Sequence, residues 1–159
     1  MVLIAVSAIA GVLAYLYLIL SFSEPPELPS AVMVSTDIDN GVKLTISSIS
    51  KSVAWVNTAI VLFDQTDSGN WTPTGHGLTN PPGESGAKTE ELGSNVLGSV
   101  TIWCNVTDLD GNGIVSPGDY FTLTTTSYST FFSTTPCAVG LICETYGTTM
   151  CYQGYGGWN

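Results

Sequence analysis

Basic residues are nearly absent from this chain. Three Lys and Arg residues stand against 13 Asp and Glu residues, which gives a formal net charge of -10 over 159 residues. Such a balance repels a polyanion like nucleic acid rather than attracting it. We therefore expect no nucleic-acid partner.

Charge of either sign is also scarce. Charged residues make up 10% of the chain, whereas an average soluble domain has about 25%. Histidine occurs once, as His76, so a Ser/His or Cys/His catalytic pair would depend on that residue alone. The adjacent carboxylates Glu90 and Glu91 are more typical of a solvated surface than of an acid–base pair. We expect no enzymatic activity.

The segment 1–22 is apolar, without charge or proline, and only Ser7, Gly11 and Ser21 interrupt it. As an α-helix it would be about 33 Å long, enough to cross a bilayer. Signal peptides and membrane anchors normally carry flanking basic residues, but the first basic residue here is Lys43. We expect a hydrophobic helix whose basic leader has been removed and which packs against identical helices. A single-pass membrane anchor is the alternative.

Beyond this segment the pattern changes to that of β-structure. Three prolines make residues 23–30 a stiff neck, and residues 31–159 form the head. Residues 31–36 and 42–47 flank the turn signal Asp39-Asn40-Gly41, whose Gly accepts positive φ, and apolar and polar side chains alternate over 42–47. This pattern predicts a first hairpin with one buried face. Residues 53–56 and 59–63 are expected to form a further strand pair or one bent strand, and 95–103 and 120–127 two more strands. The predicted fold class is α+β, a long N-terminal hydrophobic α-helix followed by an all-β immunoglobulin-like sandwich.

The opening hydrophobic helix, the neck Glu24-Pro25-Pro26-Glu27-Leu28-Pro29 and the extended stretch 31–50 together resemble archaeal type IV pilins. The resemblance covers roughly the first third of the chain. It implies a structural subunit of an extracellular, cell-surface filament used for adhesion. The subunit would be membrane-inserted as a precursor and assembled into a helical homopolymer by the pilus assembly machinery. Archaellins, the subunits of motility filaments, share this plan and are an alternative.

An Asp-rich loop spans residues 108–119. Oxygen ligands occupy loop positions 1, 3, 5, 9 and 12, with Gly at position 6, as in EF-hand calcium loops, and position 7 would contribute its backbone carbonyl. The spacing also resembles the calcium loops of dockerins. The candidate calcium ligands are Asp108, Asp110, Asn112, Ile114, Ser116 and Asp119. The alternative is an acidic turn between two strands, since Asp, Asn and Gly are preferred turn residues.

Four cysteines lie in the last third of the chain, and no pair has the CxxC spacing that zinc favours. They are Cys104, Cys137, Cys143 and Cys151. This number suits two disulfides formed in an oxidising compartment. A bridge between Cys143 and Cys151 across a hairpin would leave Cys104 to pair with Cys137, although three connectivities are open.

Two triplets fit the N-glycosylation pattern of an exported chain, Asn70-Trp71-Thr72 and Asn105-Val106-Thr107. Asn70 is the better candidate because it lies in the long polar stretch 64–94. That stretch is either a functional surface loop or contains short strands. Glycans would keep a filament with few charges soluble. The alternative is that either Asn is an ordinary loop residue.

Overall fold

The computed structural model describes residues 12, 15, 27–78, 85–125 and 130–157 of the chain. Residues 27–157, where described, form β-strands and two short helical elements. The strands are β1 (Ala31–Ile38), β2 (Gly41–Ile49), β3 (Thr58–Asp64), β4 (Ser68–Trp71), β5 (Lys88–Leu97), β6 (Val100–Asp108), β7 (Tyr120–Thr125), β8 (Cys137–Cys143) and β9 (Thr148–Tyr155). The helical elements are η1 (Trp55–Asn57) and α2 (Phe131–Thr134).

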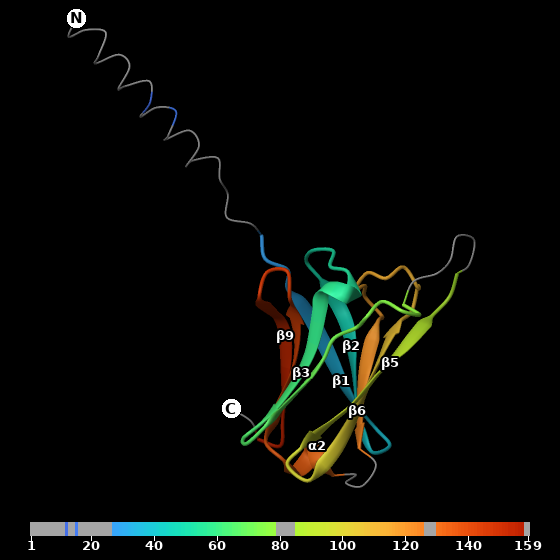
Figure 1. Cartoon of the computed structure of the whole chain (residues 1–159), viewed down its shortest axis with the longest axis vertical. Helices are drawn as coiled ribbons and strands as arrows, with labels where there is room; N and C mark the ends of the chain where they lie inside the picture. Colours follow the sequence, from blue (N-terminus) through green and yellow to red (C-terminus); the bar gives the residue numbers. More distant parts are fainter. Residues whose placement is uncertain (1–11, 13–14, 16–26, 79–84, 126–129, 158–159) are drawn as a thin grey trace, which may run out of the picture.

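The strands form two antiparallel sheets that share one core (Figure 1). One sheet has the order β1-β2-β7-β6-β5 and the other β4-β3-β8-β9. Apolar side chains alternate along β2 and β7 so that one face of each strand is buried. Trp55 and Phe121 are the largest fully buried side chains, and burying one side chain of this kind contributes roughly 1.5–3 kcal/mol.

The predicted fold class, α+β with a long N-terminal helix ahead of an immunoglobulin-like head, is wrong. The described residues are mainly β-structure, and their helical elements are three and four residues long. Of the predicted helix 1–22, Val12 and Tyr15 are described and both are helical, and the remainder lies outside the described residues. The described residues are mainly β-structure because apolar and polar residues in the head alternate with the period of strands rather than of helices.

The predicted first hairpin is confirmed, but its two turn residues have different roles from those expected. The positive φ, 59°, belongs to Asn40 rather than to Gly41. Gly41 instead permits the close approach of β2 to β7, because a Cβ at this position would lie 2.1 Å from the Leu123 carbonyl oxygen. The glycine is therefore required by strand packing and not by the turn.

Two of the other predicted strands are wrong. The stretch 53–56 includes the first two residues of η1 instead of forming a strand. Residues 95–103 comprise the end of β5, a tight turn and the start of β6. The turn is made by Gly98, which has a φ of 58°. Apolar residues on both sides of Gly98 hid the turn in the sequence. The long polar stretch 64–94 contains β4 and most of β5.

The sandwich has two ends, which we call the neck end and the distal end. β1 begins next to the neck and runs away from it (Figure 1). Because neighbouring strands are antiparallel, each loop or turn lies at one end or the other. The neck end holds η1, the loop 108–119 and the β8–β9 turn. The distal end holds α2 and the turns 38–41, 64–68 and 97–100.

Hydrogen bonds between side chains, or from a side chain to the backbone, join the two sheets along both sides of the sandwich. The Ser35 hydroxyl on β1 lies 2.6 Å from the Tyr155 hydroxyl on β9. The Asn95 side-chain amide on β5 donates to the Asn70 carbonyl on β4 at 3.0 Å. β1 and β5 each also carry a bulge. Bulged and covered edges resist pairing with strands of another chain.

Candidate functional site

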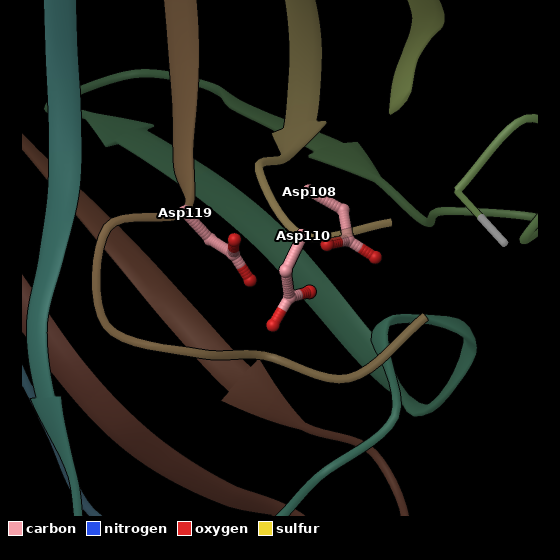
Figure 2. Close-up of side chains that lie close together, drawn as sticks. All are labelled: Asp108, Asp110 and Asp119. Carbon is pink, nitrogen blue, oxygen red and sulfur yellow. The ribbon is translucent and has the colours of Figure 1, made fainter. Parts of the chain in front are cut away.

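Asp108, Asp110 and Asp119 come together in the loop between β6 and β7 (Figure 2). Asp108 is the last residue of β6, and Asp119 directly precedes β7. One carboxylate oxygen from each of the three lies within 4.8 Å of the other two. Asp108 and Asp119 are 0% and 1% exposed, whereas Asp110 is exposed. Three carboxylates, two of them buried, thus share one small site.

Asp108 fixes the first half of the loop through backbone hydrogen bonds. Its Oδ1 accepts a hydrogen bond from the Gly111 N–H at 2.7 Å, and its Oδ2 accepts one from the Gly113 N–H at 2.6 Å. Both glycines have positive φ, 65° and 79°. A residue with a Cβ is strained there, so the pattern of glycines follows from the geometry of the loop.

Asp119 fixes the second half of the loop and ties it to the core. Its Oδ1 accepts from the Leu109 N–H at 2.8 Å, and its Oδ2 accepts from the Ser116 N–H at 2.8 Å. The Trp55 indole N–H also donates to Oδ2, at 3.3 Å. Trp55 lies on η1, 64 residues away in the sequence, and no sequence pattern connects it with the loop.

Backbone hydrogen bonds attach the loop to its surroundings. The Trp55 N–H donates to the Gly113 carbonyl at 3.0 Å, and the Val115 N–H donates to the Val53 carbonyl at 2.8 Å. On the other side, the Ile46 N–H donates to the Asp119 carbonyl at 2.8 Å. The loop is therefore held between β2 and η1 before any ligand is considered.

The buried carboxyls are difficult to ionise. Burial raises the pKa of Asp108 to about 6, the neighbouring Asp110 and Asp119 carboxyls add to the rise, and the Gly113 and Gly111 N–H donors oppose it. Burial also raises the pKa of Asp119, against the N–H donors of the loop and of the indole. A positive charge at the site would relieve both costs.

The three other predicted ligands bond within the loop. The Asn112 amide donates to Asp110 Oδ2 at 2.7 Å, and its own oxygen accepts from the Ile114 N–H at 2.6 Å. The Ser116 hydroxyl donates to the Ile114 carbonyl at 3.1 Å. The structure thus brings the three aspartates together, whereas these three residues bond to one another and to Asp110.

The carboxylate oxygens keep acceptor capacity in spite of these bonds, since each has more than one lone pair. Hard cations such as Ca²⁺ take six to eight oxygen ligands from carboxylates, carbonyls and water. The donor set of this loop fits such a cation, with exposed Asp110 on the solvent side. The arrangement suits binding of a cation and a structural role.

The four cysteines are free thiols in the structure. The β8–β9 register sets Cys143 opposite Thr148 and Cys151 opposite Leu141, so the two cysteines do not face each other directly. Cys104 and Cys137 lie in different sheets. The disulfide pairing stays a prediction. Burial raises the pKa of Cys137 and of Cys151 to about 12, which keeps these thiols protonated at neutral pH.

The two candidate glycosylation residues differ in access. Asn70 is exposed on β4, a strand at the edge of its sheet. Asn105 is half-buried on β6, between Glu91 of β5 and Thr122 of β7. A glycosyltransferase would reach the side chain of Asn70 more easily.

Glu90 of β5 contacts the loop that contains His76, but no hydrogen bond is described between the two side chains. Glu90 accepts hydrogen bonds from the Thr74 N–H at 2.9 Å and from the Gly75 N–H at 3.2 Å. His76 is exposed, and its backbone N–H donates to the Thr74 hydroxyl at 3.4 Å. The glutamate thus holds the loop 72–78 against the sandwich.

Comparison with known proteins assigns no family. No protein-family model matches this chain, and no curated protein matches it in sequence. In the described part of the chain, no helix has both the length and the apolar composition needed to span a bilayer. The basis for a functional proposal is therefore the chemistry of the chain itself.

Proposed function

We propose that this chain is a structural subunit of an extracellular filament of the type IV pilus kind, with the β-sandwich as its solvent-facing head. The observation that carries the proposal is the junction between the neck and the head. There, the chain that follows an uncharged apolar segment of 22 residues is hydrogen-bonded to the folded head at Glu27 and Ser30.

The junction is held by main-chain and side-chain bonds. The Ser50 N–H donates to the Ser30 carbonyl at 2.8 Å, and the Ser30 N–H donates to the Ser50 hydroxyl at 2.9 Å. The Lys51 ammonium donates to the Glu27 carbonyl at 3.3 Å and lies 4.9 Å from the centre of the Tyr146 ring. The chain therefore enters the head in a fixed direction, which suits a subunit whose head repeats along a filament.

In this proposal, burial of the apolar segment 1–22 drives assembly of the filament. Burying its roughly 15 large apolar side chains is worth tens of kcal/mol relative to water, at about 1.5–3 kcal/mol each. Lipid tails are about as apolar as Leu, so transfer from a membrane to a contact with identical segments costs little. The membrane before assembly, the assembly machinery and further copies of the chain are the partners that this role requires.

Calcium binding by the loop 108–119 is part of the proposal. Two buried carboxylates and one exposed carboxylate meet within 4.8 Å. A bound divalent cation would offset their mutual repulsion and join β6, β7 and η1 at the neck end. The ion would stiffen the head, since this loop has no switching helix pair beside it of the kind found in calcium sensors.

Electron microscopy of material sheared from the source cells, with mass spectrometry of the enriched fraction, tests the filament. Thin filaments composed mainly of this chain are expected. If the chain stays in the membrane fraction and no filament contains it, the proposal is wrong. As a matched control, residues 23–159 expressed alone should sediment as a folded monomer, because this piece lacks the apolar segment.

A further inference from the structure

The distal end of the sandwich carries two hollows, one on each side of α2. The larger has a volume of about 500 Å³ and the smaller about 350 Å³. Phe131 lines the larger hollow and Phe132 the smaller, and their rings are in edge-to-face contact at 5.2 Å. α2 therefore forms a wall between them, at the end of the head that faces away from the neck (Figure 1).

The larger hollow combines an apolar floor with a polar rim. Leu97, Val100 and Phe131 supply the apolar side chains, and Leu97 and Phe131 are buried. Asp64, Ser99 and Thr135 supply one carboxylate and two hydroxyls, while Gly98 leaves room between them because nothing lies within 4 Å of the position of a Cβ. Ligand pockets typically have volumes of roughly 300–1,000 Å³ and this mixture of surfaces.

The polar rim has unused hydrogen-bonding capacity. Asp64 Oδ1 accepts hydrogen bonds from Thr66 and Asp67, at 2.8 Å and 2.6 Å from their N–H groups. Within the described part of the chain, Asp64 Oδ2 and the hydroxyls of Ser99 and Thr135 have no hydrogen-bond partner. The hollow thus offers one strong acceptor and two groups that can both donate and accept.

From this combination we infer that the larger hollow binds a neutral sugar unit. A pyranose ring has an apolar C–H face, which suits the floor, and hydroxyls around its edge, which suit a rim of mixed donors and acceptors. The described residues of the lining include no Lys or Arg and so offer no cation of the kind that an anionic ligand would require. The inference extends the proposed surface role but does not depend on filament assembly.

Saturation-transfer NMR on the full chain tests the inference. The chain is held in micelles of lauryldimethylamine oxide, a detergent without a sugar headgroup. The probes are the methyl glycosides of glucose, galactose and mannose, together with N-acetylglucosamine and, as a cationic competitor, methylamine. Transfer to at least one sugar is expected, with a Kd on the order of 1–10 mM, since a small ligand in an open hollow gains little binding energy per atom.

Three variants locate the binding. Ser99→Ala and Thr135→Val each remove one rim hydroxyl and should weaken sugar binding about fivefold, the usual effect of one hydrogen bond. Ser133→Ala removes a hydroxyl from the smaller hollow on the other side of α2 and should leave binding unchanged. Circular dichroism confirms that each variant is folded.

Three outcomes overturn the inference. They are the absence of transfer to every sugar, transfer to methylamine alone, and sugar binding that survives Ser99→Phe, which fills the larger hollow. None of them affects the filament proposal, because assembly is scored separately by microscopy.

Discussion

The neck end of the sandwich is closed by hydrogen bonds, whereas the distal end is open. At the neck end, Asp108 and Asp119 together accept five hydrogen bonds, from four backbone N–H groups of the loop and from the Trp55 indole. At the distal end, α2 lies between hollows of about 500 Å³ and 350 Å³. The buried carboxylates of the neck end are therefore hydrogen-bonded within the protein, whereas polar groups around the hollows of the distal end face solvent.

The difference arises from the cost of burying charge. A carboxylate removed from water is tolerated only where donors or cations surround it. This requirement constrains the conformation of the loop 108–119, whose N–H groups must point at the buried carboxylates. Asp67, Gly98 and Ser99 at the distal end are exposed and have no such constraint. We therefore expect substitutions of the buried aspartates at the neck end to cost more than those of polar residues in the open turns of the distal end.

The largest expected contrast is between two aspartates, one at each end. Asp119→Ala should lower the free energy of unfolding by about 3–4 kcal/mol, because three N–H donors in a buried site lose their acceptor. Asp64→Ala removes an acceptor from an open turn, where water replaces it, and should cost about 1 kcal/mol. Urea denaturation of the two variants measures both values. Equal losses would show that the neck end is not the more constrained.

The pH dependence of stability sharpens the same contrast. The folded-state pKa of Asp108, about 6, is above the unfolded value of about 3.9, so the fold favours the protonated acid. The resulting stabilisation is complete below about pH 4 and is lost as the pH rises through about 6. In chelator, the free energy of unfolding should fall by up to about 3 kcal/mol between pH 4 and pH 7, since one pKa unit corresponds to about 1.4 kcal/mol.

Two controls accompany this measurement. Asp108→Asn should reduce the slope of the profile, because the amide does not titrate, while Asp119, whose pKa is also raised by burial, still contributes. Millimolar calcium should also flatten it if the ion binds, since the cation favours the ionised carboxylates and stabilises the folded state by mass action. A profile of the unsubstituted chain that rises with pH in chelator contradicts the raised pKa of Asp108.

For two glycines, the larger loss of stability is expected at the distal end rather than at the neck end. Gly41→Ala at the distal end places a Cβ 2.1 Å from the Leu123 carbonyl oxygen, which must force β2 from β7 and cost about 2 kcal/mol. Gly147→Ala in the β8–β9 turn at the neck end meets no atom within 4 Å but keeps a φ of 61°, and should cost about 1 kcal/mol. Thermal unfolding distinguishes them, and a larger loss for Gly147→Ala would refute the steric explanation.

The sequence predicted the parts of the molecule that rest on local chemistry. The first hairpin and the aspartates of the loop 108–119 could be located because alternation and turn residues act over a few neighbours. Trp55, which binds Asp119 across 64 residues, had no local signal. Nor did the close approach at Gly41, which depends on a strand that lies far along the chain.

The errors also have physical causes. The predicted strand 95–103 joined two real strands because the turn at Gly98, which has a φ of 58°, lies between apolar residues. The expected α+β class gave too much weight to residues 1–22, whereas the described residues form sheets.

The smallest expected effect concerns the junction at the neck. Ser50→Ala removes the hydroxyl that accepts from the Ser30 N–H, and because the site is exposed, the loss should be about 0.5 kcal/mol. The released neck should be cut roughly twice as fast after Glu27 by a Glu-specific protease, since this free energy corresponds to a doubling of the open state. Ser52→Ala, two residues away and exposed, is the matched control. Equal cleavage rates in both variants would mean that the Ser30–Ser50 contact does not fix the direction of the neck, and the rigid display of the head would need another cause.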